Sequence, residues 1–143
     1  MQEVCDGLGE QAIDKSAYLA LLADSYLQAN QLKQAATAVE QGLEHIRTTG
    51  ERYLAAELIR LRGEVELRLK NDPEHAEALF REAIALSRKQ AARAWEIKAT
   101  RSLTHLLNSL GRQREIDDEF APILARFDRS SRRARRLSSP RFS

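Results

Sequence analysis

Apolar side chains recur every three or four residues through most of the 143-residue chain. This spacing places them on one side of an α-helix, because a helix turns once in about 3.6 residues. Six stretches show the pattern, at approximately residues 12–29, 32–48, 51–70, 76–84, 95–110 and 116–127. The pattern therefore predicts six helices and an all-α fold.

Turn-forming residues mark the ends of these stretches. Gly50 and Gly111 each follow a helical stretch, where glycine commonly ends a helix. Asp72 and Pro73 precede the fourth stretch. There an aspartate accepts the free N–H groups of the first turn, and proline fits the first helical position. Pro122 lies within the sixth stretch and predicts a kink or break there, because proline has no N–H to donate.

The short connections predict antiparallel helix hairpins, and the hairpins repeat along the chain. The pattern Ala76-x3-Phe80-x2-Ala83 has counterparts that begin at Ala35 and Ile116, which are 41 and 40 residues away. A period of about 40 residues with two helices per unit is typical of an α-solenoid. The predicted organisation is an N-terminal extension (1–11), a repeat domain (12–128, with units at about 12–48, 51–90 and 92–128) and a tail (129–143).

The composition is typical of a helical domain with a solvent-exposed surface. Hydrophobic residues make up 43% of the chain and charged residues 31%, and the six glycines and three prolines are few. No apolar run approaches the roughly 18 residues of a membrane span. The first residues lack the basic start and apolar core of a signal peptide, and the single Cys5 cannot form an intrachain disulfide. We therefore expect a cytoplasmic protein with no membrane partner.

Positive charge is concentrated in the predicted tail. Residues 129–143 contain six arginines and no acid, so the net charge of +2 for the whole chain leaves −4 for residues 1–128. Such a composition predicts disorder. The tail is expected either to have no role, or to form an electrostatic arm for nucleic acid or an acidic surface, or to hold a kinase site at 135–138. The arginines of the electrostatic hypothesis are Arg132, Arg133, Arg135 and Arg136.

The repeat resembles the tetratricopeptide (TPR) family, whose pattern sets bulky and small residues on the first helix of a unit and Ala, Phe and Ala on the second. In the first unit these positions hold Leu19, Leu22, Ala23 and Tyr26, then Ala35, Val39 and Gly42. In the second they hold Ile59, Arg62, Gly63 and Glu66, then Ala76, Phe80 and Ala83. In the third they hold Thr100, Leu103, Thr104 and Leu107, then Ile116, Phe120 and Ile123.

The chain departs from that family in having a period longer than about 34 residues and no terminal proline in any unit. The resemblance implies a right-handed superhelical array of three antiparallel helix hairpins, a TPR-like α-solenoid. Such arrays act as scaffolds for protein–protein interaction.

A narrower resemblance covers roughly residues 16–127. The segments 18–26, 50–53, 56–64, 80–88 and 94–103 are similar to the C-terminal repeat region of large bacterial signalling proteins, which join an adenylate or guanylate cyclase, or a regulator domain, to an ATPase. The cyclase and ATPase motifs lie in other domains of those proteins and are missing here. The resemblance therefore implies a regulatory fragment and neither of the two activities.

No motif in the sequence predicts catalysis, a cofactor or a metal. Gly7 and Gly9 lack the Lys-Ser/Thr ending of a phosphate-binding loop. His45, His75 and His105 lie about 30 residues apart on different predicted helices, so they are interpreted as helix-surface residues. Acidic residues at 115–119 are expected to complement the dipole at a helix start. We expect a protein that is not an enzyme.

The first helix of each unit lines the concave face of a solenoid, which predicts the binding residues. Positions between the packing positions include Ala20, Leu27 and Glu57, and the candidate groove residues are Asp24, Gln28, Arg60, Glu64, Arg68, Lys98, Arg101, His105 and Asn108. The basic residues among them, Arg60, Arg68, Lys98 and Arg101, would receive acidic side chains or a carboxylate of a partner segment. The alternative is a solvated face with pairs within each helix.

The single tryptophan, Trp95, opens the fifth predicted helix, and Tyr53 has a comparable place one unit earlier. An aromatic side chain there is expected to pack between hairpins or to stack on a peptide.

Three functions follow as hypotheses. The first is a module that binds a protein or peptide, a neighbouring domain of a larger parent protein, or a second copy of the chain. The alternative is a regulatory fragment of a cyclase–ATPase signalling protein. Nucleic-acid binding through the tail is the least favoured.

Overall fold

The computed structural model describes residues 15–120, 122 and 125, and it confirms the all-α class. This part of the chain consists of helices and the turns between them, without a strand. The predicted extension (1–11), the first residues of the first predicted helix, most of 121–128 and the arginine tail lie outside the described residues.

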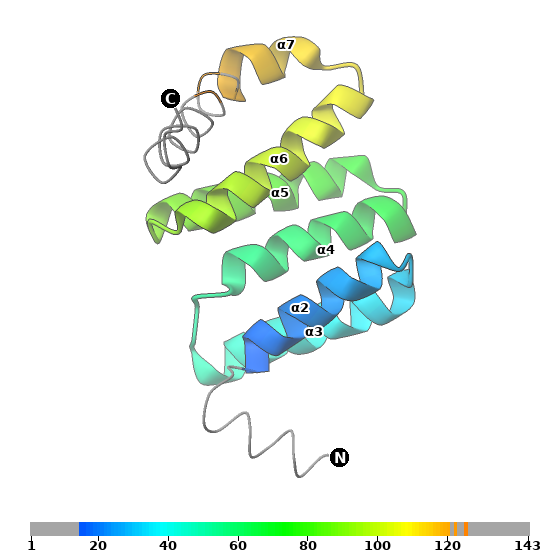
Figure 1. Ribbon diagram of the computed structural model, residues 1–143, viewed down its shortest axis with the longest axis vertical. Coiled ribbons are helices and arrows are strands. Elements are labelled where there is room, and N and C mark those ends of the chain that lie inside the picture. The colour runs from blue at the N-terminus through cyan, green and yellow to red at the C-terminus, as the bar shows by residue number, and fades with distance from the viewer. Residues whose placement is uncertain (1–14, 121, 123–124, 126–143) are drawn as a thin grey trace, which may run out of the picture. The chain divides into compact units, whose positions relative to one another are not determined.

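The helices follow the predicted order (Figure 1). They are α2 (Lys15–Gln28), α3 (Leu32–Thr49), α4 (Ala55–Leu69), α5 (Pro73–Lys89), α6 (Arg93–Ser109), a short α7 (Gln113–Glu115) and a π-helical segment η1 (Ile116–Phe120). The chain divides into two compact units, and the boundary falls inside α6, between Ser102 and Leu103.

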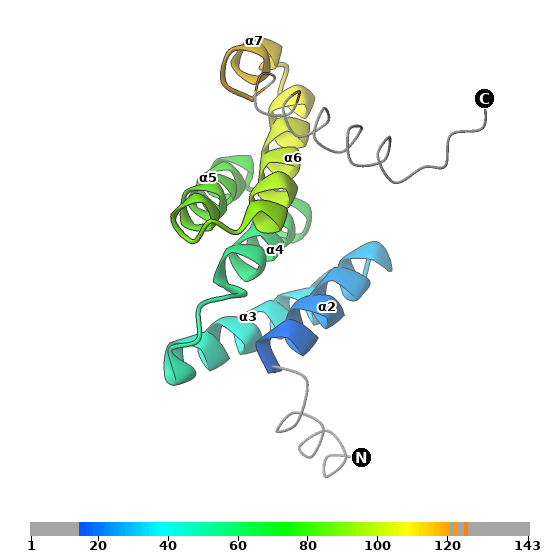
Figure 2. The same cartoon turned by 60° about the vertical axis from the view of Figure 1, so that its left-hand side comes forward.

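The first unit contains two helix hairpins. α2 packs against α3 and α4 packs against α5, as Figure 2 shows, and α4 also contacts both helices of the first hairpin. Small and branched apolar residues fill the space between α2, α3 and α4, among them Ala23, Val39, Leu58 and Leu61. Trp95, in the first turn of α6, packs against this cluster.

Two glycines allow helices to approach closely in this unit. A Cβ added at Gly63 of α4 would lie 2.6 Å from Cε1 of Phe80, a ring of α5 with no exposed surface. A Cβ added at Gly42 of α3 would lie 2.8 Å from Cδ2 of Leu58 on α4. The apolar periodicity predicted that these helices pack, and the glycines determine how closely.

Residues with positive φ occur at the turn after each long helix. They are Asn30, Gly50, Asn71, Ala91 and Gly111. Asn30, Asn71 and Gly111 are 41 and 40 residues apart, and Gly50 and Ala91 are 41 apart. Asn and Gly are the residues that best tolerate this left-handed conformation at a helix end. The turns therefore repeat with the same period as the predicted helix pattern.

Ala91 is the exception among these turn residues, because its Cβ disfavours the φ of 55° that the backbone adopts. We expect Ala91→Gly to raise the free energy of unfolding by about 0.5–1 kcal/mol. Gly111→Ala makes the opposite change at a φ of 75° and should lower it by a similar amount. Chemical denaturation of both variants measures the effect. Destabilisation by Ala91→Gly would contradict the assigned turn conformation.

The third helix begins later than predicted, at Ala55 rather than near Glu51. The Glu51 carboxylate accepts the backbone N–H of Tyr53 at 2.7 Å and the hydroxyl of the buried Ser16 at 2.8 Å. These bonds hold residues 51–54 in a turn that ties the start of α4 to the start of α2. A helical pattern cannot reveal this, since Glu51 would also suit the first turn of a helix.

The second unit contains the end of α6, followed by α7 and η1. Leu103, Leu107, Ile116 and Phe120 are buried. The π-helical segment ends two residues before Pro122, whose missing N–H and bulky ring disturb the preceding helical turn. The helix expected over 116–127 is π-helical over Ile116–Phe120, and most residues around the kink expected at Pro122 lie outside the described residues.

Candidate functional site

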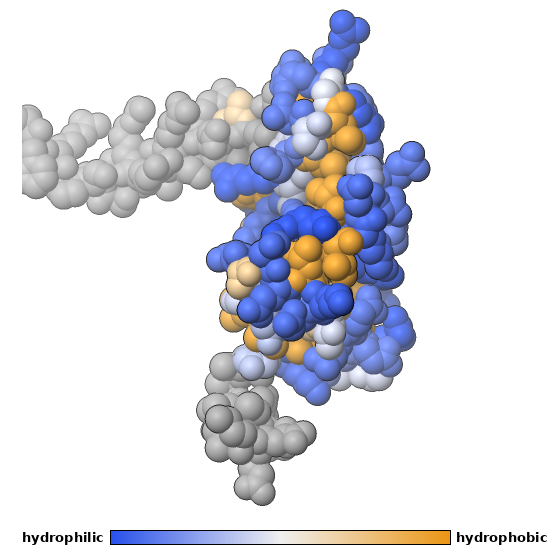
Figure 3. Space-filling view, turned by 90° about the vertical axis from the view of Figure 1, so that its right-hand side faces the viewer, coloured by the Kyte–Doolittle hydropathy of each residue, from blue (hydrophilic) through white to orange (hydrophobic). Residues whose placement is uncertain are grey.

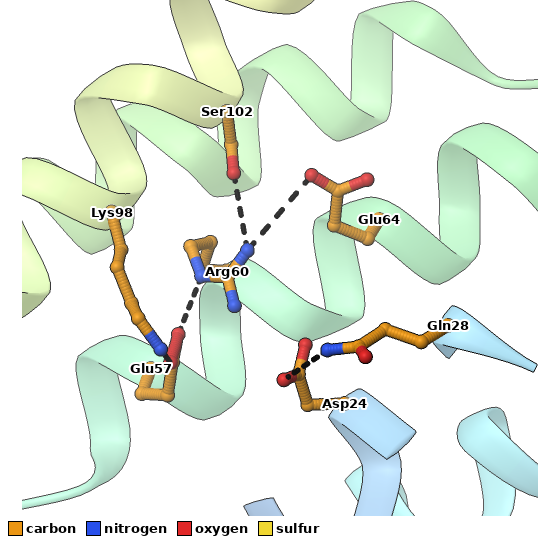
Figure 4. A network of polar contacts seen from close by, with 7 residues as sticks. All are labelled: Asp24, Gln28, Glu57, Arg60, Glu64, Lys98 and Ser102. Atoms are coloured by element: carbon orange, nitrogen blue, oxygen red, sulfur yellow. Dashed lines mark hydrogen bonds and ion pairs between the residues drawn. The ribbon is translucent and has the colours of Figure 1, made fainter. Parts of the chain in front are cut away.

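Polar side chains of three helices converge on one side of the first unit (Figure 4). We call this set the polar face, and it comprises Asp24 and Gln28 of α2, Arg60 and Glu64 of α4, and Lys98 and Ser102 of α6. Five of these six belong to the predicted groove. The structure thus brings together predicted residues that are as many as 74 positions apart in the sequence.

The centre of the polar face is an ion-pair network around Glu57. This carboxylate is buried, and it accepts from Arg60 Nε at 2.5 Å and from Lys98 Nζ at 3.2 Å. Arg60 also donates to Ser102 Oγ at 3.2 Å, and its side chain is only 11% exposed. The network connects α4 to the first part of α6. It engages Arg60 and Lys98, two of the four cations that were expected to receive an acidic partner.

The remaining predicted groove residues have separate surroundings. Arg68 donates to the side-chain oxygen of Asn30 at 3.1 Å, in the turn after α2. Arg101 is exposed, and it interacts with another residue of the protein. His105 and Asn108 are exposed on the part of α6 that belongs to the second unit.

Three positions assigned to the exposed groove are buried, which corrects the prediction. Ala20 and Leu27 lie in the core cluster, and Glu57 is 5% exposed. α2 packs against both α3 and α4, so its buried stripe is wider than one hairpin requires. Glu57 is buried because its two oxygens each have a cationic partner, which compensates part of the cost of removing the charge from water.

A second candidate site lies at the starts of α4 and α6. A cavity of about 450 Å³ is lined there by Arg52, Tyr53 and residues 90–95. The rings of Tyr53 and Trp95 meet edge to face, with centroids 6.1 Å apart and planes at 66°. Gln90 Nε2 donates to the Arg52 carbonyl at 3.0 Å and ties the two turns together. We call this site the aromatic pocket.

Several polar groups of the aromatic pocket have no partner among the described residues of the protein. Arg52 and Arg93 are exposed, and neither guanidinium has an ion pair with a described residue. Most other arginines of α3 to α5 pair with an acid, as Arg47 does with Glu44. The buried atoms Trp95 Nε1 and Gln90 Oε1 have no hydrogen-bond partner within the described part of the chain.

The aromatic pocket was only partly predictable. Tyr53 and Trp95 were recognised as related positions, and their expected packing is observed. Arg52, Gln90 and Arg93 were missed, because nothing in the sequence distinguishes an unpaired arginine from a paired one.

One group of residues has the chemistry of metal ligands. Ligand atoms of Glu66, Asp72 and His75 lie within 4.8 Å of one another at the turn between α4 and α5. Lys70 Nζ contacts one Glu66 oxygen at 3.1 Å, and His75 Nδ1 contacts the other at 3.4 Å. Asp72 accepts the backbone N–H of His75 at 3.1 Å, as the sequence predicted for a helix cap. These contacts account for the cluster as a stabilised turn.

Comparisons place no further constraint on the sites. Scans against protein-family models, curated proteins and solved structures each gave no match. None of the helices that the structure describes has the length and apolar character needed to cross a membrane.

Proposed function

We propose that the chain is a non-catalytic protein-interaction module built from TPR-like helix hairpins, and that its polar face receives a segment of a partner protein. The observation that carries the proposal is the convergence of α2, α4 and α6 side chains on one side of the first unit. Neighbouring first helices of successive hairpins line the concave surface in a solenoid. The repeated left-handed turns, 40–41 residues apart, support the same architecture.

The chemistry of the polar face indicates the kind of partner. Arg60 and Lys98 are already engaged by Glu57, whereas Asp24, Gln28 and Glu64 retain acceptor capacity. Asp24 accepts from Gln28 Nε2 at 3.0 Å and has further lone pairs. A partner segment that donates hydrogen bonds or carries a cation fits this surface better than the acidic segment expected from the sequence.

Apolar side chains on α2 support docking of a larger partner as well. Tyr18 and Leu21 are exposed, the latter by 68%. Figure 3 shows one face of the molecule, on which apolar side chains reach the surface between polar ones. A neighbouring domain or a second copy that covers Tyr18 and Leu21 would extend the array, as stacked hairpins require at their ends.

The test compares a polar-face variant with a matched control. Asp24→Ala/Gln28→Ala/Glu64→Ala removes acceptor side chains of the face, including Glu64, whose Oε1 lies 4.0 Å from Arg60 Nη1. Gln34→Ala/Thr37→Ala/Glu82→Ala changes exposed positions of α3 and α5. Wild type and both variants are used as baits in an extract of the source cells, with quantitative mass spectrometry. We expect a protein that the control retains and the polar-face variant loses, and that binds the purified wild-type chain. Equal retention by both variants would contradict the proposal.

A further inference from the structure

We propose that the aromatic pocket is a second docking site, which binds a short peptide segment with a bulky apolar side chain flanked by acidic residues. The inference rests on residues other than those of the polar face, although Lys98 of that face lies over the Trp95 ring, 5.6 Å from its centroid. It follows from the shape of the pocket, the residue types that line it and the charges left without partners.

The pocket is preformed and large enough for a side chain with its flanking backbone. Its volume of about 450 Å³ lies within the range of roughly 300–1,000 Å³ typical of ligand sites. The Gln90–Arg52 hydrogen bond and the Tyr53–Trp95 contact fix its walls. Trp95 is also anchored in the core cluster. Walls held by such contacts lower the entropic cost of binding for the residues that they fix.

The lining combines the three residue types that dominate binding energy at protein interfaces, namely Trp, Tyr and Arg. Tyr53 is 65% exposed, although its ring provides a large apolar surface. Covering this ring with an apolar side chain would remove its apolar surface from water. The apolar side chain of the bound peptide would lie against Tyr53 and Trp95.

The charge of the partner follows from the arginines. Arg52 and Arg93 have no acidic neighbour with which they pair among the described residues, in contrast to the paired arginines of α3 to α5. A guanidinium binds a carboxylate through two parallel hydrogen bonds. Acidic residues on both sides of the apolar side chain would therefore meet one arginine each.

Nucleic acid shares the need for arginines and aromatic rings but fits less well. Bases are bound by stacking on an aromatic face, and here the two rings meet at 66° rather than forming a parallel slot.

The single tryptophan makes the site directly observable, because all tryptophan fluorescence of the protein comes from Trp95. The probe is the peptide acetyl-Gly-Ser-Asp-Phe-Asp-Ser-Gly-amide, titrated into the full chain. Comparison peptides carry Lys-Phe-Lys or Asp-Ala-Asp at the centre. We expect a saturable change in Trp95 emission with Asp-Phe-Asp and at least about tenfold weaker binding of both comparison peptides.

Variants locate the binding. Arg52→Ala/Arg93→Ala should weaken Asp-Phe-Asp binding at least about tenfold, and Tyr53→Ala should weaken it by a similar factor. Calorimetry measures these affinities, so that a purely optical effect on Trp95 emission is excluded. Arg114→Ala, at an exposed arginine of the second unit, is the matched control and should bind normally. The polar-face variant should also bind normally, so that failure of this site is distinguishable from failure of the proposed function. Circular dichroism verifies that each variant is helical.

Three results would overturn the inference. The first is no saturable response to Asp-Phe-Asp. The second is that the wild type binds Lys-Phe-Lys as tightly as Asp-Phe-Asp, or that the double arginine variant binds Asp-Phe-Asp as tightly as the wild type does. The third is tighter binding of an eight-nucleotide oligothymidine, lost in the same double variant, which would assign the pocket to nucleic acid instead.

Discussion

Gly63→Ala is expected to lower the free energy of unfolding by about 2 kcal/mol, although alanine is the better helix former by roughly 0.5–1 kcal/mol. The added Cβ would lie 2.6 Å and 2.8 Å from two atoms of the Phe80 ring. That ring has no exposed surface, so it cannot move without displacing its own neighbours. Overpacking therefore outweighs the gain in helix propensity, and thermal or urea unfolding measures the difference.

Gly42→Ala is the matched control for this effect. Its new Cβ would also be close to a buried side chain, at 2.8 Å and 3.0 Å, but the atoms it meets are the two methyl groups of Leu58. These can rotate away more easily than a ring, so we expect a loss of less than about 1 kcal/mol. Phe80→Leu should relieve part of the Gly63→Ala defect, giving a double variant more stable than the sum of the single effects. Strict additivity, or a neutral Gly63→Ala, would contradict the assigned α4–α5 packing.

Glu57→Ala should have the second large effect, with a loss of roughly 2–3 kcal/mol of unfolding free energy. The substitution leaves Arg60, 11% exposed, without the carboxylate that it contacts at 2.5 Å. Glu64 cannot replace it fully, because its nearest oxygen lies 4.0 Å from Arg60 Nη1. Lys98 loses its partner as well, so the contact between α4 and α6 weakens.

Glu44→Ala provides the comparison, since Glu44 forms an ion pair with Arg47 in which both side chains are mostly exposed. Exposed pairs contribute about 0–1 kcal/mol, so this variant should unfold almost like the wild type. Urea denaturation of both variants at low and high salt measures the two effects. A small, salt-sensitive loss for Glu57→Ala would show that its network is an ordinary surface pair.

The helices were predictable because their signal is local. Apolar residues at three- and four-residue spacing, Gly50, Asp72 and Gly111 gave the order of the helices and most of their ends. The late start of α4 was not predictable, since it depends on a bond between Ser16 and Glu51 that joins residues 35 positions apart. The burial of Leu27 was missed for the same reason, because it requires knowing that α4 as well as α3 covers α2.

The candidate sites show a similar limit. The resemblance to tetratricopeptide repeats placed Asp24, Arg60 and Lys98 on the groove side, and the structure brings them together. The sequence could not show that the Glu57 carboxylate is buried and forms ion pairs with both Arg60 and Lys98. The sequence thus shows which side chains are charged. Whether a charged side chain is free to bind a partner depends on ion pairs formed between helices. Arg52 and Arg93 of the aromatic pocket are charged and have no ion pair with a described residue, which the sequence alone did not indicate.

Site-specific photocrosslinking tests the central claim, that the polar face of this helical module receives a partner, most directly. A benzophenone amino acid is placed at Gln28, an exposed member of the face, or at Thr37, an exposed residue of α3. Each protein is irradiated in the source cells. We predict discrete crosslinked adducts from position 28 and only background from position 37. Adducts of equal yield from both positions, or from position 37 alone, would contradict the polar face as the partner site.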